Sequence, residues 1–252
     1  MPWYHEFFDE LYLEQYRHLI PPERTIAEVD AILDLLEIEP GARILDLCCG
    51  HGRHSTELAA RGLDVCGQDL TPMFLERAAE AAAQRGVRLD LRQGDMREIV
   101  HDPPFDAVIH IFTAFGYFSD DDEEARVVRE VARVLRPGGR YLLQTINRDG
   151  VVRRFLRKDW EEWDSGMRLL CERTFDPVSG RNRERRETIF PDGSRRVQDI
   201  SVRLFTPPEI RRMMRDAGLE PTASYATLGR DELTVDSMHQ VNIAIKPGSQ
   251  PS

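Results

Sequence analysis

The stretch ILDLCCGHGRHS, residues 44–55, decides the fold that we predict for this chain. Its apolar start predicts a short buried strand, and the segment GHG predicts a sharp turn into a helix. Glycine allows such turns and lets a ligand approach the main-chain N–H groups at the start of a helix. The stretch therefore predicts a strand, a glycine turn and a helix, with room for a ligand at the turn.

The spacing of the glycines shows whether the turn fits the dinucleotide-binding pattern. A dinucleotide-binding turn has the pattern GxGxxG, in which the third glycine allows the helix to pack closely on the strand. Here Gly50 and Gly52 are present, but Ser55 stands where the third glycine would be. A dehydrogenase that uses NAD is therefore a weaker alternative, and a turn with only a structural role also stays open.

Further strands and helices alternate around this unit. Residues 2–19 predict one amphipathic helix, and Thr25 with Glu28 predicts the capped start of a second helix that ends at Leu36. Apolar runs and helical patterns predict the later elements: strands at 63–68, 88–93, 105–111 and 140–146, and helices at 72–85 and 121–135. This alternation predicts an α/β fold with a doubly wound, mostly parallel sheet of seven strands and helices on both faces.

The pattern changes after residue 150. Three β-like runs between residues 167 and 205, separated by turn residues, predict an antiparallel β insert. Thr206 and Glu209 predict another capped helix, and two final strands close the sheet, near 220–228 and 240–246. We therefore expect four parts: an N-terminal helical lid (1–40), a Rossmann-like domain (41–150 and 206–247), the insert as a substrate cap or dimer contact (151–205), and a disordered tail (248–252).

Carboxylates mark the ends of the first three predicted strands. Asp46 lies inside the first strand, Asp69 ends the second, and Asp95 follows the third. The carboxyl ends of parallel strands meet at one edge of a sheet, where ligands of open α/β sheets bind. We therefore expect these three side chains to face one crevice beside the glycine turn.

Five segments of the chain, taken in order, resemble the class I S-adenosylmethionine-dependent methyltransferases. They are LDLCCGHG (45–52), VCGQDLT (65–71), QGDMRE (93–98), FDAVIHIFTAFGYF (105–118) and LRPGGRYLL (135–143). The resemblance implies S-adenosyl-L-methionine as cofactor and S-adenosyl-L-homocysteine as product. It also implies in-line transfer of a methyl group to a nitrogen or oxygen of a small-molecule metabolite.

The resemblance assigns cofactor contacts residue by residue. The loop around the methionine part would comprise Asp46, Cys48, Gly50, His51 and Gly52. Asp69 would bind the ribose hydroxyls and Leu70 would pack on the adenine, whose amino group and ring nitrogen would meet Asp95 and the Met96 backbone. Ile111 and Phe112 would border the sulfonium.

Candidates for catalysis and acceptor binding lie around these segments. A general base is needed only when the acceptor atom carries a proton near neutral pH, and His110 and Tyr117 are the candidates. The candidates for acceptor contacts are Tyr4, Tyr16, Phe115, Trp160 and Arg168. Each of these side chains has an alternative role in ordinary packing, because aromatic residues at helical spacing most often belong to a core.

Composition limits the partners. The net charge of −10 disfavours nucleic acid, whose binding depends on clustered cations, and residues 151–199 hold twelve basic and ten acidic residues. No apolar run is long enough for a membrane span, and the spacing of the four cysteines fits neither a zinc site nor a disulfide framework. We expect a cytoplasmic monomer or homodimer, with no metal and a small-molecule substrate. Methylation of RNA or protein, and cofactor binding without catalysis, remain alternatives.

Overall fold

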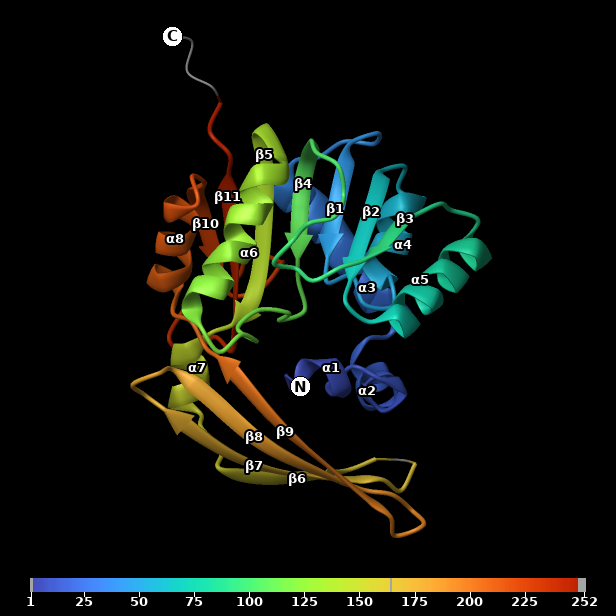
Figure 1. Ribbon diagram of the computed structural model, residues 1–252, viewed down its shortest axis with the longest axis vertical. Coiled ribbons are helices and arrows are strands. Elements are labelled where there is room, and N and C mark those ends of the chain that lie inside the picture. Colours follow the sequence, from blue (N-terminus) through green and yellow to red (C-terminus); the bar gives the residue numbers. More distant parts are fainter. Residues whose placement is uncertain (1, 164, 249–252) are drawn as a thin grey trace.

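The computed structural model describes residues 2–163 and 165–248 and contains two β-sheets (Figure 1). The larger sheet has the strand order β10-β11-β5-β4-β1-β2-β3, and β11 is antiparallel to both of its neighbours while the other pairs are parallel. Its strands are β1 Arg43–Leu47, β2 Asp64–Asp69, β3 Asp90–Gln93, β4 Phe105–His110, β5 Leu135–Ile146, β10 Glu220–Tyr225 and β11 His239–Ile245. The predicted doubly wound sheet of seven strands is confirmed.

Helices cover both faces of this sheet because neighbouring side chains of a strand point to opposite faces. Ile44 and Leu45 of β1 belong to different hydrophobic clusters, one shared with α3 and α4 and the other with α6 and α8. α5 packs against β2, β3 and α4. These helices are α3 Pro22–Leu36, α4 Arg53–Ala60, α5 Pro72–Arg85, α6 Asp121–Val134 and α8 Pro207–Asp216.

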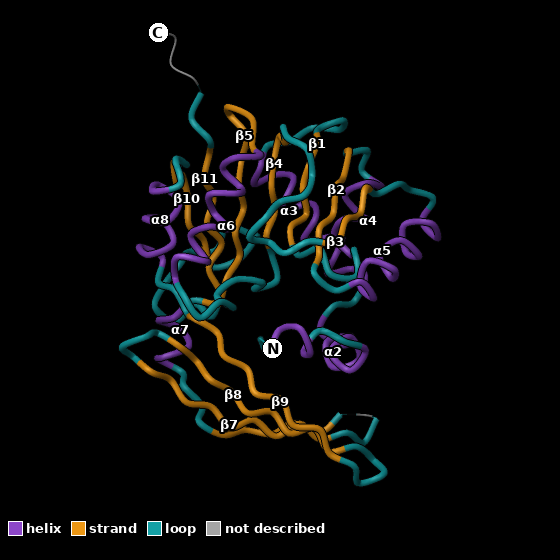
Figure 2. Tube along the Cα trace, viewed as in Figure 1, coloured by secondary structure: helices purple, strands orange, loops and turns teal. Residues whose placement is uncertain are grey.

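The smaller sheet is antiparallel and has four strands, one more than the sequence predicts. It follows α7 (Arg148–Arg153) and comprises β6 Lys158–Glu162, β7 Arg168–Asp176, β8 Arg181–Ile189 and β9 Arg195–Arg203, in that order. Figures 1 and 2 show it as a curved sheet beside the carboxyl edge of the larger sheet, with the N-terminal helices in between. The insert therefore faces the edge where the strand-end carboxylates lie.

The N-terminal segment differs from the single helix predicted for residues 2–19. It forms α1 Tyr4–Phe7, α2 Glu10–Tyr16 and a 3₁₀ turn, η1 Arg17–Leu19. The break falls at Asp9, whose backbone is extended and whose carboxylate accepts a hydrogen bond from the Tyr12 backbone N–H at 3.0 Å. A side chain that satisfies a free N–H at a helix start favours a new helix over continuation of the old one.

The predicted start of the second helix at Thr25 is wrong. α3 begins at Pro22, because proline fits the first helical position without losing a hydrogen bond. Glu28 therefore does not cap the helix, and its carboxylate instead contacts Arg24, Arg53 and His54. By contrast, α8 begins as predicted, with Glu209 accepting from the Thr206 backbone N–H at 2.7 Å.

Two further predictions concern the C-terminal tail and membrane-spanning helices. The predicted tail, residues 248–252, lies outside the described residues except for Gly248. Within the described part, no helix has the length and apolar character that crossing a bilayer requires.

Candidate active site

The glycine loop connects β1 to α4 through a run of left-handed backbone conformations. Cys48, Gly50 and Gly52 have φ angles of 60°, 56° and 75°. A Cβ atom on Gly52 would come within 2.5 Å of the Ala78 Cβ, so the approach of α5 requires glycine at this position. The Gly50 N–H donates to Asp69 Oδ2 at 2.8 Å, which ties the loop to the end of β2.

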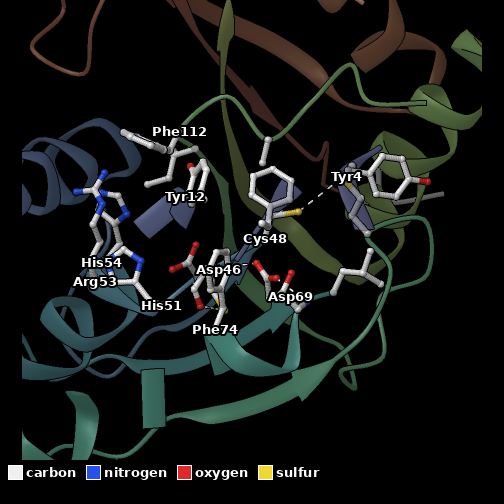
Figure 3. A pocket seen from close by; sticks show the side chains of 18 of the residues that line it. Tyr4, Tyr12, Asp46, Cys48, His51, Arg53, His54, Asp69, Phe74 and Phe112 are labelled. Atoms are coloured by element: carbon white, nitrogen blue, oxygen red, sulfur yellow. Dashed lines mark hydrogen bonds between the residues drawn. The ribbon is translucent and has the colours of Figure 1, made fainter. Parts of the chain in front are cut away.

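A cavity of about 1060 Å³, partly open to solvent, adjoins this loop (Figure 3). Asp46, Asp69 and Asp95 all contribute to its lining, as expected for strand ends that meet at one edge of the sheet. The larger sheet supplies the floor of the cavity and the N-terminal helices cover it. Further lining residues include Tyr4, Phe8, Tyr12 and Tyr16; His51, Arg53 and His54; Leu70 and Phe74; Met96; Ile111 and Phe112; Tyr117 and Phe118.

The three carboxylates differ in their environment. Burial raises the pKa of Asp46 to about 7, although its Oδ2 accepts a hydrogen bond from the Ser55 hydroxyl at 2.6 Å. Burial also raises the pKa of Asp69, and this rise is opposed by hydrogen bonds from the Thr71 and Gly50 N–H groups. Burial also acts to raise the pKa of Asp95, but hydrogen bonds from Arg97 outweigh this effect and lower that pKa. The cavity can therefore hold negative charge that a cationic ligand would stabilise.

Aromatic rings of α1 and α2 form a cover that we call the aromatic roof, defined as Tyr4, Phe8, Tyr12 and Tyr16. Three of its rings are in contact, with 4.4 Å between the centroids of Tyr12 and Tyr16 and 5.0 Å between those of Phe8 and Tyr12. Tyr4 is linked to them through Tyr117, whose centroid lies 6.1 Å from that of Tyr4 and 5.8 Å from that of Phe8. The roof also contacts α5, since the ring centroids of Phe74 and Tyr12 lie 6.0 Å apart. Such a roof reduces the access of solvent to the space beneath it.

The four-stranded sheet holds the aromatic roof from the other side. Arg196 donates to Asp9 Oδ2 at 2.5 Å and to the Glu6 carbonyl at 3.1 Å. Gln15 donates to the Thr188 hydroxyl at 3.1 Å, and Arg186 donates to the Tyr16 hydroxyl at 3.1 Å. The insert therefore fixes helices that are distant from it in sequence.

One end of the cavity is lined by nitrogen-containing side chains and is braced by α3. Figure 3 shows His51, Arg53 and His54 grouped there. The Arg53 guanidinium lies 5.1 Å from the Phe112 ring centroid and also contacts Glu28. Burial opposes ionisation of Glu28, but hydrogen bonds from His54 and Arg53 lower its pKa to about 2. Burial lowers the pKa of His54 to about 4, so its ring is neutral at neutral pH.

The structure brings most of the predicted cofactor contacts together. The cavity lining includes every one of them except Gly52, which shapes the loop. Among the catalytic and acceptor candidates, Tyr117, Tyr4 and Tyr16 line the cavity. Phe115 lies outside the lining and packs against His110 and Phe205.

The remaining candidates lie elsewhere. His110 is buried in the core, where its ring contacts the Ala114 carbonyl at 2.5 Å and the Tyr141 hydroxyl at 3.3 Å, and burial lowers its pKa to about 4. Trp160 lies on β6 with 65% of its surface exposed. Arg168, on β7, forms an ion pair with Glu162 at 2.9 Å. None of the three lines the cavity.

Sequence reasoning left Phe8, Arg53 and Phe74 out of the candidate site. Phe74 lies in the first turn of α5, directly after the strand that ends in Asp69, and a first turn at that edge could have indicated it. No local pattern indicates Phe8 or Arg53, because each reaches the cavity only through the position of its helix in the fold.

Known proteins are similar to the region of the chain that holds the glycine loop and the three strand-end carboxylates. Residues 44–139 match a protein family described as a methyltransferase domain. A stretch of 109 residues is 34% identical to the ubiquinone biosynthesis O-methyltransferase of Marinobacter nauticus, and covers 43% of this chain and 46% of that protein. Curated relatives are matched over 36% to 52% of their own length, so the chain spans about half of them or less.

Two solved structures share the whole fold. An S-adenosylmethionine-dependent methyltransferase from Clostridium acetobutylicum superposes with a TM-score of 0.81 at 15% identity, covering 98% of this chain and 99% of that one. CalS10, an amino pentose methyltransferase from Micromonospora echinaspora solved with S-adenosylmethionine bound, superposes with a TM-score of 0.71 at 23% identity, covering 95% and 98%. These likenesses show that the insert and the N-terminal helices belong to the shared fold.

Proposed function

This chain belongs to the class I S-adenosylmethionine-dependent methyltransferases, and from that premise we propose that it transfers a methyl group to a nitrogen or oxygen of a small-molecule acceptor. The observation that carries the proposal is the covered cavity, in which the glycine loop, three strand-end carboxylates and the aromatic roof enclose one space. S-adenosylmethionine would supply the methyl group on a sulfonium, and S-adenosylhomocysteine would be the product.

The chemistry of the lining fits this cofactor. Asp69 accepts one N–H on each carboxylate oxygen and has lone pairs left for the ribose hydroxyls. Asp95 and the Met96 backbone would meet the adenine, and Leu70 would pack against it. Asp46 would face the positive charge of the methionine part, and Ile111 and Phe112 would border the sulfonium.

We propose that catalysis here depends on positioning and on exclusion of water. Orientation of two reactants can contribute on the order of 7–11 kcal/mol to lowering a barrier. Burial raises the pKa of Tyr117 well above its usual value, so its hydroxyl stays protonated and can orient an acceptor by a hydrogen bond. His110 would act as a positioning residue, because its ring holds the Ala114 carbonyl in the loop that carries Phe112.

The N-terminal helices would act as a lid, with the four-stranded sheet as its support. This role is consistent with the contacts of Arg186 with Tyr16 and of Arg196 with Asp9. A lid must open to admit the cofactor, and such motions control access to many active sites. Trp160 and Arg168 would then contribute to the structure of the four-stranded sheet and would not contact the acceptor.

A small-molecule acceptor is supported by the enclosure of the cavity and by two relatives. One is named for ubiquinone biosynthesis and the other for an amino pentose. The net charge of −10 also disfavours a nucleic acid partner. A cytoplasmic location is consistent with the four unpaired cysteines, Cys48, Cys49, Cys66 and Cys171.

Calorimetric titration with S-adenosylmethionine and S-adenosylhomocysteine tests the cofactor site. We expect both ligands to bind the wild-type protein, and Asp69→Ala to weaken binding by about tenfold or more, which corresponds to ~1.4 kcal/mol. Asp64→Ala is the matched control, because Asp64 begins the same strand with its carboxylate exposed and outside the cavity. Absence of binding to the wild-type protein, or equal binding by both variants, would contradict the proposal.

A further inference from the structure

A second cluster of chemically active side chains lies away from the active cavity. Cys66 belongs to β2, Asp90 begins β3, and His101 lies in the segment between β3 and β4. Their Sγ, carboxylate and imidazole atoms all lie within 4.8 Å of one another. Cys66 is 1% exposed and His101 is 2% exposed, and none of the three lines the cavity.

The orientation of His101 leaves one ring nitrogen free for a ligand. Both neighbours of the ring, the Gly67 carbonyl and the Asp90 carboxylate, only accept hydrogen bonds, but only Nε2 has hydrogen-bond geometry, 3.1 Å from the Gly67 carbonyl. Burial lowers the pKa of His101, so the ring is neutral and carries its one proton on Nε2. Its Nδ1 then presents a lone pair toward Asp90 Oδ2, 3.3 Å away. This buried nitrogen makes no hydrogen bond within residues 2–163 and 165–248. Two facing lone pairs are unfavourable unless a cation lies between them.

One separation matches that between two ligands of a tetrahedral metal ion, and the others are somewhat longer or bounded at 4.8 Å. With zinc–nitrogen and zinc–oxygen bonds of about 2.0–2.1 Å, tetrahedral geometry places the two ligand atoms about 3.3–3.4 Å apart, and a sulfur and an oxygen ligand about 3.5 Å apart. The observed distances are 3.3 Å between His101 Nδ1 and Asp90 Oδ2 and 3.9 Å between Cys66 Sγ and Asp90 Oδ2. Small side-chain shifts would therefore complete the geometry.

We propose that Cys66, Asp90 and His101 bind a divalent transition metal ion of the zinc class, with water at the fourth position. A thiolate, a carboxylate and an imidazole form a ligand set that zinc prefers, and the two anionic ligands balance its charge. Metal binding by Cys66 would release the thiol proton to solvent.

The surrounding groups would support the ligands. The Gly67 carbonyl orients His101, as carbonyls commonly do for metal-binding histidines. Two cations face the cluster: Arg92 donates to Asp90 Oδ2 at 3.1 Å, and Arg43 Nη2 lies 3.7 Å from Cys66 Sγ. Both guanidiniums would bind lone pairs that the metal does not use. Their positive charge is offset by nearby carboxylates: Asp64 lies 3.5 Å from Arg43 Nε, and Asp102 lies 3.8 Å from Arg92 Nη1.

The site would connect the cofactor cavity to the sheet. The segment between β3 and β4 carries Asp95 and Met96 of the cavity as well as His101. A metal ion that joins His101 to β2 and β3 would fix the far end of this segment, so we infer a structural role.

Cobalt(II) titration of the full-length, reduced and chelator-treated protein tests this site independently of methyl transfer. We expect a thiolate-to-cobalt charge-transfer band in the near ultraviolet that disappears in Cys66→Ser and persists in Cys171→Ser. Cys171 is the matched control, because it is also a buried unpaired cysteine but lies on β7. Zinc should displace the cobalt and raise the melting temperature of the wild-type protein and of Cys171→Ser, but not that of Cys66→Ser.

Asp90→Asn provides a second variant that should fold normally, because this side chain is exposed. We expect it to weaken cobalt binding at least tenfold while the circular dichroism spectrum stays unchanged. A wild-type protein without the charge-transfer band would overturn the proposal. So would a band that survives in Cys66→Ser, since it would place the cobalt at the adjacent cysteines Cys48 and Cys49.

Discussion

Ser55 explains one departure of this sequence from a dinucleotide-binding turn. It is fully buried, and its hydroxyl donates to Asp46 Oδ2 at 2.6 Å. A third glycine would leave this carboxylate without that partner in a buried place, where an unsatisfied polar group costs about 1–3 kcal/mol. Ser55, which weakens the NAD alternative, therefore holds the Asp46 side chain in place at the floor of the cavity.

Asp46 makes the proposed cofactor binding dependent on pH. Burial raises its pKa to about 7, so the carboxyl is protonated in much of the free protein below that pH. S-adenosylmethionine carries positive charge and favours the ionised form, so binding at lower pH must release a proton. We expect the affinity to fall as the pH decreases below about 7, by up to about tenfold per pH unit.

Calorimetry between about pH 5.5 and 7.5, in buffers of different ionisation enthalpy, measures both the affinity and the proton release. Asp46→Asn is the control, because the amide oxygen can still accept from Ser55 but does not titrate in this range. We expect the variant to bind more weakly near pH 7.5 and with little pH dependence. An equal slope in the two proteins would show that another group is responsible.

At the scale of elements, the N-terminal helices depend on the insert for their position. α1 and α2 are short, and isolated helices of this length are not stable in water. They are ordered by packing on the cavity and by the polar contacts of β8 and β9 with Asp9, Gln15 and Tyr16. The insert can therefore influence the cavity without lining it.

Arg196→Gln tests this link between the insert and the lid. It removes the ion pair with Asp9, and a partly exposed pair of this kind contributes at most about 1 kcal/mol. We expect the dissociation constant for S-adenosylhomocysteine, measured by calorimetry, to rise by up to about fivefold. Arg195→Gln is the neighbouring control, because Arg195 pairs with Glu187 of the same sheet and not with the N-terminal helices. Equal affinities in the two variants would argue against a lid held by the sheet.

At the scale of the whole molecule, the arginines of the insert do not form an unbalanced basic surface. Cross-strand ion pairs offset the basic side chains of the insert, among them Lys158 with Glu172 at 3.1 Å, Arg168 with Glu162 at 2.9 Å, Arg185 with Asp199 at 3.5 Å and Arg195 with Glu187 at 2.9 Å. RNA binding requires cations that are free to replace condensed counterions. The distribution of charge therefore favours a small-molecule acceptor over RNA.

Fluorescence anisotropy with a labelled single-stranded RNA checks this conclusion. We expect no binding at micromolar protein in low salt, because the whole chain has a net charge of −10. An affinity that falls steeply as salt is added would instead support an RNA substrate. Addition of S-adenosylhomocysteine during the measurement shows whether occupancy of the cavity changes the result.

The sequence by itself determined the larger sheet and the position of the cavity within it. Alternating apolar runs and helical patterns are local signals, and the carboxyl ends of parallel strands necessarily meet at one edge. For that reason Asp46, Asp69 and Asp95 were predicted to share a crevice, and they line one cavity. The glycine loop followed in the same way from the backbone freedom of Gly50 and Gly52.

Only the tertiary structure decided which side chains reach the cavity from distant segments. His110 and Trp160 have the residue types of functional groups, but burial in the core and exposure on β6 keep them away from it. Cys66, Asp90 and His101 show no metal-binding spacing: the pairing of β2 with β3 places Cys66 beside Asp90, and the segment after β3 brings His101 to them. The physical reason is that such contacts depend on packing between elements, which no local pattern of residues specifies.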